Sequence, residues 1–226
     1  MVKFLAKGIN YVAGNLLKTQ HVFLSSSLVS LKRERKIDRN YFDYIRLASL
    51  ELIGYEIRKN GIPGSTAELG VYKGKFARYI NEYFPDRKLY LFDTFEGFDM
   101  RDLSSEEKHA YSSGTQDFSG TSVAQVLAGM PFPENCIPVK GFFPESAKEV
   151  NDNFVFVSLD ADLFDPIYSG LNFFYPKLAI GGYIFIHDFN NEGYKGTRKA
   201  VEQFCREQNL GFTPLPDSGG SAIIAK

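Results

Sequence analysis

The chain has 226 residues, 44% of them hydrophobic and 23% charged, which is ordinary for a globular protein with one main domain and a small extension. Its formal net charge is −1 at pH 7, so it lacks the basic footprint of a nucleic-acid-binding protein and we expect no nucleic-acid partner. No apolar run reaches the roughly 18 residues of a membrane span, the N-terminus lacks a secretory signal, and the expected location is cytoplasmic.

Residues 1–37 are predicted to be an N-terminal helical extension, followed by the main domain at residues 38–226. Phe4, Ile9 and Val12 recur at helical spacing, and a basic run follows at residues 32–36. We expect an amphipathic helix and a polar linker that cap the domain or contact a second copy of the chain. An alternative is attachment to a membrane surface through the basic run.

A helix is predicted from Tyr41 to Lys59, with Ile45 among its apolar residues, and glycines and a proline at 60–64 end it. The next stretch is Thr66-Ala67-Glu68-Leu69-Gly70-Val71-Tyr72-Lys73-Gly74. Its glycines let the backbone turn sharply and approach a ligand closely. Because the order acid-x-Gly-x-x-x-Gly lacks the Gly-x-Gly start of a dinucleotide fingerprint, a ligand without phosphates fits better.

A second buried strand is predicted from Lys88 to Phe92. Asp93 ends this strand and can accept hydrogen bonds from the hydroxyls of a ribose. The polar region from Phe98 to about Gly120 is long for a loop in a compact domain. We expect it to cover the substrate as a lid, because it leaves from the strand end that carries the ribose acid. A solvated insertion is the alternative.

The rest of the chain alternates short helices and strands. A helix at 123–127 and a strand at 136–140 come first, and helices at 168–178 and 197–208 follow later. Two short strands at 212–215 and 221–225 are joined by a glycine-containing turn. Their hairpin predicts one antiparallel strand at the end of an otherwise parallel sheet.

Two runs are apolar throughout, which is typical of strands buried on both faces of a parallel sheet. The first, at 154–159, is followed by Asp160 and Asp162, and the second, at 183–186, is followed by His187 and Asp188. In open α/β sheets the ligand lies outside the carboxyl ends of the strands. Six ionisable residues fall at such ends or just beyond them: Glu68, Asp93, Asp160, Asp162, His187 and Asp188.

Bringing six ionisable groups to one edge of a sheet would be costly without ligands. The sequence therefore predicts a binding site there, although a carboxylate that only caps the following helix is the alternative for each acid. Asp160, His187 and Asp188 could hold one divalent cation. Carboxylates suit magnesium, and the histidine favours manganese or another transition metal. Such a cation lowers the pKa of a bound hydroxyl, while a nearby base takes the proton.

Several stretches resemble the macrocin-type O-methyltransferases, enzymes that use S-adenosylmethionine to methylate sugar hydroxyls of antibiotic natural products. They are Asp93–Phe98, Asp160–Pro166, Tyr175–Leu178, Gly181–Ile184 and the helix Asp43–Leu52. The resemblance covers about residues 38 to 210. It implies a Rossmann-like class I methyltransferase fold, an α/β fold with a mostly parallel seven-stranded sheet and one antiparallel strand near the C-terminus.

The resemblance also implies roles for individual residues. Asp160 would bind metal, Asp162 would be the general base, and the pair 187–188 would complete the metal site. The family usually has Asp-Asp at this pair, so His187 could instead orient the substrate. The implied cofactor-binding residues are Glu68, Gly70, Tyr72, Gly74, Asp93, Thr94 and Asp160.

We therefore expect a metal-assisted O-methyltransferase that acts on a hydroxyl of a sugar or related natural product. One alternative is a nicotinamide-dependent oxidoreductase, which accounts for Asp93 but not for the missing Gly-x-Gly turn. Another is an inactive methyltransferase-fold module that binds a nucleoside ligand or a partner protein. His187 favours this module, whereas the paired acids Asp160 and Asp162 argue against it.

Overall fold

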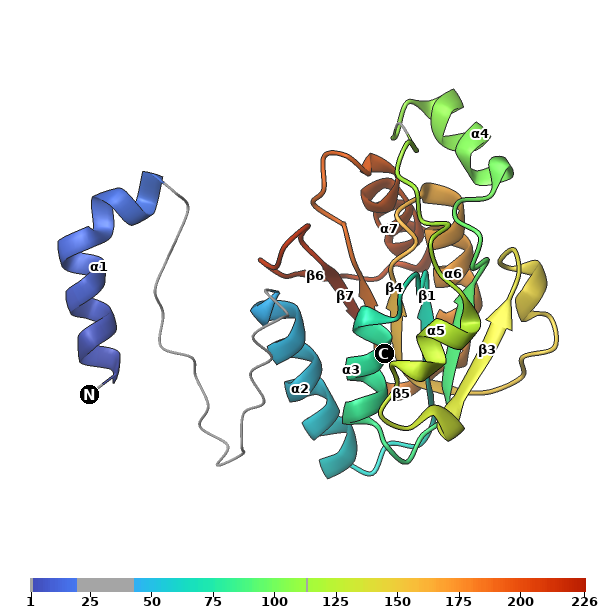
Figure 1. Ribbon diagram of the computed structural model, residues 1–226, viewed down its shortest axis with the longest axis horizontal. Coiled ribbons are helices and arrows are strands. Elements are labelled where there is room, and N and C mark those ends of the chain that lie inside the picture. Colours follow the sequence, from blue (N-terminus) through green and yellow to red (C-terminus); the bar gives the residue numbers. More distant parts are fainter. Residues whose placement is uncertain (1, 20–42, 113) are drawn as a thin grey trace. The chain divides into compact units, whose positions relative to one another are not determined.

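The computed structural model describes residues 2–19, 43–112 and 114–226 (Figure 1). The chain divides into two units, Met1–Phe42 and Asp43–Lys226. In the first unit, helix α1 spans Val2–Thr19, so the predicted amphipathic helix forms. The basic run at 32–36 and the predicted domain boundary at 37/38 lie outside the described residues.

The second unit alternates helices and strands along the chain. Its helices are α2 (Tyr44–Lys59), α3 (Lys75–Tyr83), α4 (Met100–His109), α5 (Val123–Ala128), α6 (Phe164–Lys177) and α7 (Lys195–Gln208), with the 3-10 turns η1 (Pro133–Asn135) and η2 (Glu145–Ala147). Its strands are β1 (Ser65–Leu69), β2 (Leu89–Asp93), β3 (Cys136–Lys140), β4 (Phe154–Leu159), β5 (Leu178–Ile186), β6 (Thr213–Pro214) and β7 (Ala222–Ala225).

The strands form one seven-stranded sheet in the order β3-β2-β1-β4-β5-β7-β6. Neighbours from β3 to β5 are parallel, and β7 runs antiparallel to both β5 and β6. This confirms the predicted sheet with one antiparallel strand. The chain builds outwards in one direction from β1 and in the other from β4, so the carboxyl ends of β1 and β4 flank the point where strand order reverses. Ligands of open α/β sheets bind at such a point.

Apolar side chains cover both faces of the central strands. Every residue of β1 and β4 is buried, as the continuous apolar run at 154–159 predicts. On one face, Phe154 packs against Phe174 of α6, with ring centroids 5.0 Å apart. On the other, Phe156 packs against Phe84 beyond α3 and Phe185 of β5. This two-sided core fixes the strand ends from which the ionisable residues project.

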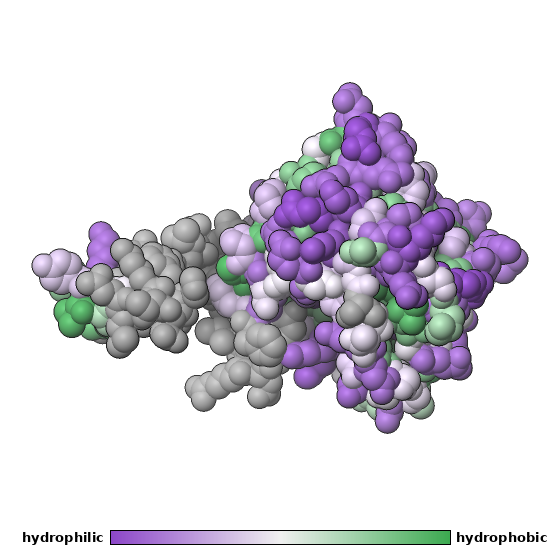
Figure 2. All heavy atoms as spheres, turned by 90° about the horizontal axis from the view of Figure 1, so that it is seen from above, coloured by the Kyte–Doolittle hydropathy of each residue, from purple (hydrophilic) through white to green (hydrophobic). Residues whose placement is uncertain are grey.

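Within the predicted lid region, residues 100–109 form helix α4. The expectation that the whole region is a loop was therefore wrong for these residues. Asp99 caps the helix by accepting the amide of Arg101 at 2.9 Å, and Ala110 ends it at φ 54°. Figure 2 looks down on the side where α4 lies in Figure 1, and hydrophilic residues dominate this face. The sequence did not predict this helix because it has no apolar stripe.

Two elements begin at least four residues earlier than predicted. Helix α6 begins at Phe164, before the expected Tyr168, because Pro166 in its first turn suits a helix start. Strand β5 begins at Leu178, before the expected Tyr183, and it continues through Gly181 at φ +83°. None of the described helices is long and apolar enough to cross a membrane. The cytoplasmic location stays a prediction.

Candidate active site

The glycine turn between β1 and α3 is held by Asp93 at the end of β2. Its Oδ2 accepts the amides of Val71 at 2.7 Å and Tyr72 at 2.8 Å, and its Oδ1 accepts the amide of Phe95 at 2.6 Å. The predicted ribose acid thus also fixes the backbone of the turn. A carboxylate oxygen has two lone pairs, so Oδ1 keeps the capacity to accept a ligand hydroxyl.

The two glycines of this turn are required by packing within the protein. A Cβ on Gly70, at φ +85°, would lie 2.1 Å from the carbonyl oxygen of Asp160. A Cβ on Gly74, at φ +72°, would lie 2.9 Å from side-chain atoms of Val126 and Met130. Gly70 lets the turn pass close to the end of β4, and Gly74 lets α3 begin beside α5. Close approach of these glycines to a ligand stays a prediction.

Tyr72 lies within this turn, and Thr94 directly follows β2. The backbone of Tyr72 is at φ 48°, its carbonyl accepts the hydroxyl of Thr121 at 2.5 Å, and its ring meets Phe118 edge-on at 5.0 Å. The hydroxyl of Thr94 donates to the carbonyl of Gly97 at 2.6 Å. The two residues therefore shape the loops around the glycine turn, and their contact with a cofactor stays a prediction.

Glu68 is a buried acid within β1 whose carboxylate lies near the Ser158 side chain and the Ala77 backbone without full hydrogen-bond geometry to either. The side chain is 1% exposed, and neither oxygen accepts a hydrogen bond from the described residues. Burial raises the pKa of Glu68 to about 8, and the negative charge of Asp160 adds to this increase. Buried polar atoms normally have partners, so these oxygens suit a ligand that brings hydrogen-bond donors.

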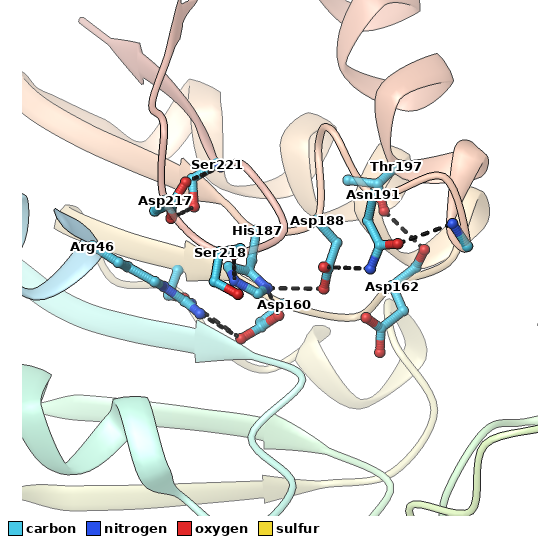
Figure 3. A network of polar contacts seen from close by, with 12 residues as sticks. Arg46, Asp160, Asp162, His187, Asp188, Asn191, Thr197, Asp217, Ser218 and Ser221 are labelled. Carbon is cyan, nitrogen blue, oxygen red and sulfur yellow. Dashed lines mark hydrogen bonds and ion pairs between the residues drawn. The ribbon is translucent and has the colours of Figure 1, made fainter. Parts of the chain in front are cut away.

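Asp160, His187 and Asp188, the three predicted metal ligands, meet beyond the ends of β4 and β5 (Figure 3). The His187 Nδ1 atom lies 3.1 Å from Oδ1 of Asp160 and 2.8 Å from Oδ2 of Asp188. Its Nε2 atom lies 3.0 Å from the carbonyl oxygen of Ser218. Because a carbonyl only accepts, Nε2 carries a hydrogen and Nδ1 is the atom that faces the carboxylates. Asn191 also donates to Oδ1 of Asp188 at 2.8 Å.

The protein balances the charges of this cluster internally. Burial opposes ionisation of Asp160, but the nearby charges of Arg46 and His187 outweigh it and hold its pKa well below the usual range. Burial likewise disfavours the charged form of His187, but Asp160 outweighs it and raises the pKa of His187 to about 10. Burial raises the pKa of Asp188, and the hydrogen bond and charge of His187 lower it overall. The imidazolium of His187 thus lies between two carboxylates.

Arg46 of α2 completes this charge network, and the sequence analysis missed it. Its Nη1 and Nη2 atoms each lie 3.0 Å from Oδ2 of Asp160, and Nη2 also lies 3.2 Å from the hydroxyl of Ser158. The guanidinium stacks 3.8 Å over the ring of Phe76 and is buried. Ile45, which the sequence analysis included among the apolar residues of this helix, is 37% exposed. A signal existed, because Arg46 lies one helical turn before the buried Leu50.

Asp162, the predicted general base, lies beyond Asp188 in the same view (Figure 3). Its backbone is in the left-handed region at φ 61°, and its carbonyl accepts the hydroxyl of Thr197 at 2.8 Å. Burial raises its pKa well above the usual value, and the charges of Asp160 and Asp188 add to this. A carboxylate with a raised pKa is a stronger proton acceptor once it is ionised.

The donor atoms of the cluster fit a divalent cation. Neighbouring ligands at about 2.1 Å from a cation lie roughly 3 Å apart, which is close to the 2.8 Å and 3.1 Å separations around His187 Nδ1. The bond from Nε2 to the Ser218 carbonyl fixes the tautomer that leaves Nδ1 for a metal, once its proton is lost. Two carboxylates and an imidazole suit manganese or a similar transition metal better than magnesium.

The sequence matches a known family of proteins. The family model of the macrocin-O-methyltransferases (TylF) matches residues 36–217. Comparison of the sequence with curated proteins gives no match.

Solved structures of methyltransferases share the fold. The O-methyltransferase NovP is 19% identical with a TM-score of 0.67, over 80% of this chain and 79% of that one. CalS11, a calicheamicin methyltransferase, is 19% identical with a TM-score of 0.64, over 80% and 78% of the two chains. The methyltransferase PaMTH1 of Podospora anserina, solved with bound S-adenosylhomocysteine, is 13% identical with a TM-score of 0.50, over 89% and 99%.

The ion pair between Arg46 and Asp160 is expected to stabilise the fold. Arg46→Met leaves a buried carboxylate without its guanidinium partner, and we expect the free energy of unfolding to fall by about 2 to 4 kcal/mol. The double variant Arg46→Met with Asp160→Asn should lose less than the sum of the two single losses, because neither charge then lacks its partner. Urea denaturation measures the free energy of unfolding of Arg46→Met, of Asp160→Asn and of the double variant.

The exposed pair of Lys140 and Glu96, with 2.7 Å between Nζ and Oε1, provides the matched control. Lys140→Met should cost under about 1 kcal/mol, because both partners are solvated. Additive losses for Arg46 and Asp160 would mean that the two residues stabilise the fold independently.

Proposed function

The chain belongs to the macrocin-O-methyltransferase (TylF) family, and we propose that it transfers a methyl group from S-adenosylmethionine to a hydroxyl of a small molecule. The observation that carries this proposal is the group of Asp160, Asp162, His187 and Asp188 beside the switch point of the sheet. A set of possible metal ligands and a neighbouring carboxylate base could together activate a weakly acidic hydroxyl for methylation.

When bound, S-adenosylmethionine supplies an electrophilic methyl group. Asp93 would accept hydrogen bonds from its ribose, and the remaining lone pair on Oδ1 supports this role. Glu68 would lie towards its amino acid portion, where the ammonium group brings the donors that both buried oxygens lack. Five further residues would surround the cofactor: Gly70, Tyr72, Gly74, Thr94 and Asp160.

Asp162 would act as the general base. The acceptor oxygen would bond to the methyl carbon while the bond from that carbon to the sulfonium sulfur breaks, which leaves S-adenosylhomocysteine. The proton of the acceptor hydroxyl would pass to the carboxylate of Asp162. The raised pKa of this residue supports the role, because burial and the neighbouring carboxylates make it a strong proton acceptor. The hydrogen bond from Thr197 to the Asp162 carbonyl would keep the side chain in position during the reaction.

Asp160, His187 and Asp188 would hold a divalent cation, for which manganese is the better candidate. When bound, the cation supplies positive charge that orients and acidifies the acceptor hydroxyl. The support is the 3.1 Å and 2.8 Å separations of His187 Nδ1 from the oxygens of Asp160 and Asp188, together with the tautomer of His187 that the Ser218 carbonyl fixes.

The acceptor is proposed to be a sugar or a glycosylated natural product. One neighbour in structure, CalS11, is described as a TDP-rhamnose 3'-O-methyltransferase of calicheamicin biosynthesis, and the chain belongs to a family described by macrocin methylation. The polar helix α4 and the aromatic rings of Phe98 and Phe118 near the glycine turn would suit a polar ring. The predicted lid would cover this acceptor.

The N-terminal segment is proposed to join two copies of the chain. Residues 1–42 contain eight Lys or Arg and two Asp or Glu, whereas residues 43–226 carry the acidic excess that brings the whole chain to −1. Exposed apolar side chains of α1, such as Phe4 and Val12, would add buried area.

Light scattering should give the mass of a dimer for the wild type. The double variant Phe4→Asp with Val12→Asp should give the mass of a monomer. A monomeric wild type would contradict the proposal.

Removal of the proposed base should lower the rate of methyl transfer strongly but leave the affinity for the cofactor unchanged. For Asp162→Asn we expect methyl transfer from radiolabelled S-adenosylmethionine to a panel of TDP-sugars to fall at least about 100-fold. The affinity for S-adenosylhomocysteine should stay within about twofold. The exposed Asp86, changed to Asn, is the matched control and should keep full turnover. Unchanged transfer by Asp162→Asn would refute its role as the base.

Binding of manganese should depend on the strand-end residues. Calorimetry should detect one Mn²⁺ per chain, and Asp188→Asn or His187→Ala should weaken it by at least about tenfold, because each removes one proposed ligand. The Asp86→Asn variant should bind as the wild type does. Equal affinity in all variants would place the cation elsewhere, and no binding at all would refute the metal site.

A further inference from the structure

Helix α4 buries a single side chain, and that side chain is a carboxylate. Glu106 is 1% exposed, while all other residues of α4 are partly or fully exposed. A helix normally attaches to the body of a protein through an apolar stripe, which α4 lacks. Arg101 at its start stacks 3.4 Å over the ring of Phe142, and Glu106 is its one buried contact with the body of the domain.

The first of these contacts caps helix α6. Glu106 Oε1 accepts the backbone amide of Phe164, the first residue of α6, at 2.6 Å. The residue at the capping position, Leu163, has no side-chain oxygen to do this. The amides at the start of a helix need acceptors and carry partial positive charge, so a carboxylate from another element serves well.

The same carboxylate lies against the start of helix α7. A Cβ on Gly196 would lie 2.6 Å from Oε1 and 3.1 Å from Oε2 of Glu106, so only glycine allows this approach. Tyr194, at the capping position of α7, makes no side-chain hydrogen bond with the helix. Burial raises the pKa of Glu106, and the amide of Phe164 offsets part of this rise. Glu106 thus hydrogen-bonds the start of α6 and lies against the start of α7, where its Oε2 atom accepts no hydrogen bond among the described residues.

These contacts connect α4 to the turn that carries Asp162. Phe164 follows Asp162 by two residues, and Thr197 near the start of α7 donates to the Asp162 carbonyl at 2.8 Å. The segment after α4 joins the same group, because the Tyr111 carbonyl accepts the amide of Lys195 at 3.2 Å. The ring of Tyr111 also lies 5.6 Å from that of Phe164. The turn is therefore held by α4 on one side and by α7 on the other.

We propose that Glu106 is a positioning residue that latches helix α4 onto the starts of α6 and α7, so that one contact both closes the predicted lid and holds the Asp162 turn. The role of Asp162 rests on the proposed function, whereas the latch rests on the contacts of Glu106 alone. A carboxylate suits a latch that opens, because the carboxylate and the helix amides can both be hydrated after they separate. An apolar contact would expose its surface to water instead.

Hydrogen exchange of the purified full-length protein tests this latch. In Glu106→Ala, exchange should rise about fivefold to tenfold in peptides covering residues 100–112 and 161–166, the size expected for loss of one helix cap. Peptides from the central strands should not change. Glu106→Gln should restore most of the protection, because its amide oxygen can still accept the Phe164 amide. Glu107→Ala, an exposed neighbour on the same helix, is the control and should behave as wild type.

Unchanged exchange at 161–166 in Glu106→Ala would overturn the proposal. A rise spread evenly over the sheet would overturn it too, because Glu106 would then act only on global stability. If the alanine variant does not fold, Glu106→Asp, whose shorter side chain cannot reach Phe164, should show the same local rise. Binding of S-adenosylhomocysteine by the wild type, measured alongside, separates the two hypotheses. If the wild type does not bind S-adenosylhomocysteine, the proposed function is refuted, while the exchange result still tests the latch.

Discussion

The structure depends on how it compensates two carboxylates, Asp160 and Asp188, at the end of a buried parallel sheet. Each would be costly to ionise alone in this environment. His187 lies between them, and Arg46 reaches Asp160 from α2, so both acids stay ionised. The position of α2 on the sheet thus supplies the site with its permanent positive charge as well as an apolar face.

The site and its scaffold share their polar contacts. Asp93 holds the glycine turn through three backbone amides while it keeps a free lone pair for a ligand. Ser218 fixes the tautomer of His187, and Thr197 holds the backbone of Asp162. Contacts within the protein therefore hold the polar groups of the site in place, which is the preorganisation that electrostatic catalysis uses. Helix α4 is the exception, because its one buried side chain is the carboxylate of Glu106 and its other contacts, such as that of Arg101 with the Phe142 ring, are made by exposed or partly exposed residues.

The sequence was enough to predict the sheet and the strand ends, because apolar runs followed by acids are local patterns. The runs at 154–159 and 183–186 brought Asp160 and His187 to the edge where the structure has them. Arg46 was missed because its partner Asp160 is 114 residues away and the contact depends on how α2 packs. Helix α4 was missed because helices without an apolar stripe leave only weak propensity signals. The sequence also could not show why glycine is needed at position 70, because the atom that leaves no room for a side chain is the carbonyl oxygen of the distant Asp160.

The central claim is that this fold binds S-adenosylmethionine beside Asp93 and Glu68. Isothermal titration of the wild-type protein with S-adenosylhomocysteine, and separately with NAD, tests it most directly. We expect saturable binding of one S-adenosylhomocysteine per chain and no heat from NAD, because the glycine turn lacks the start of a pyrophosphate-binding motif. Binding of NAD without any binding of S-adenosylhomocysteine would contradict it.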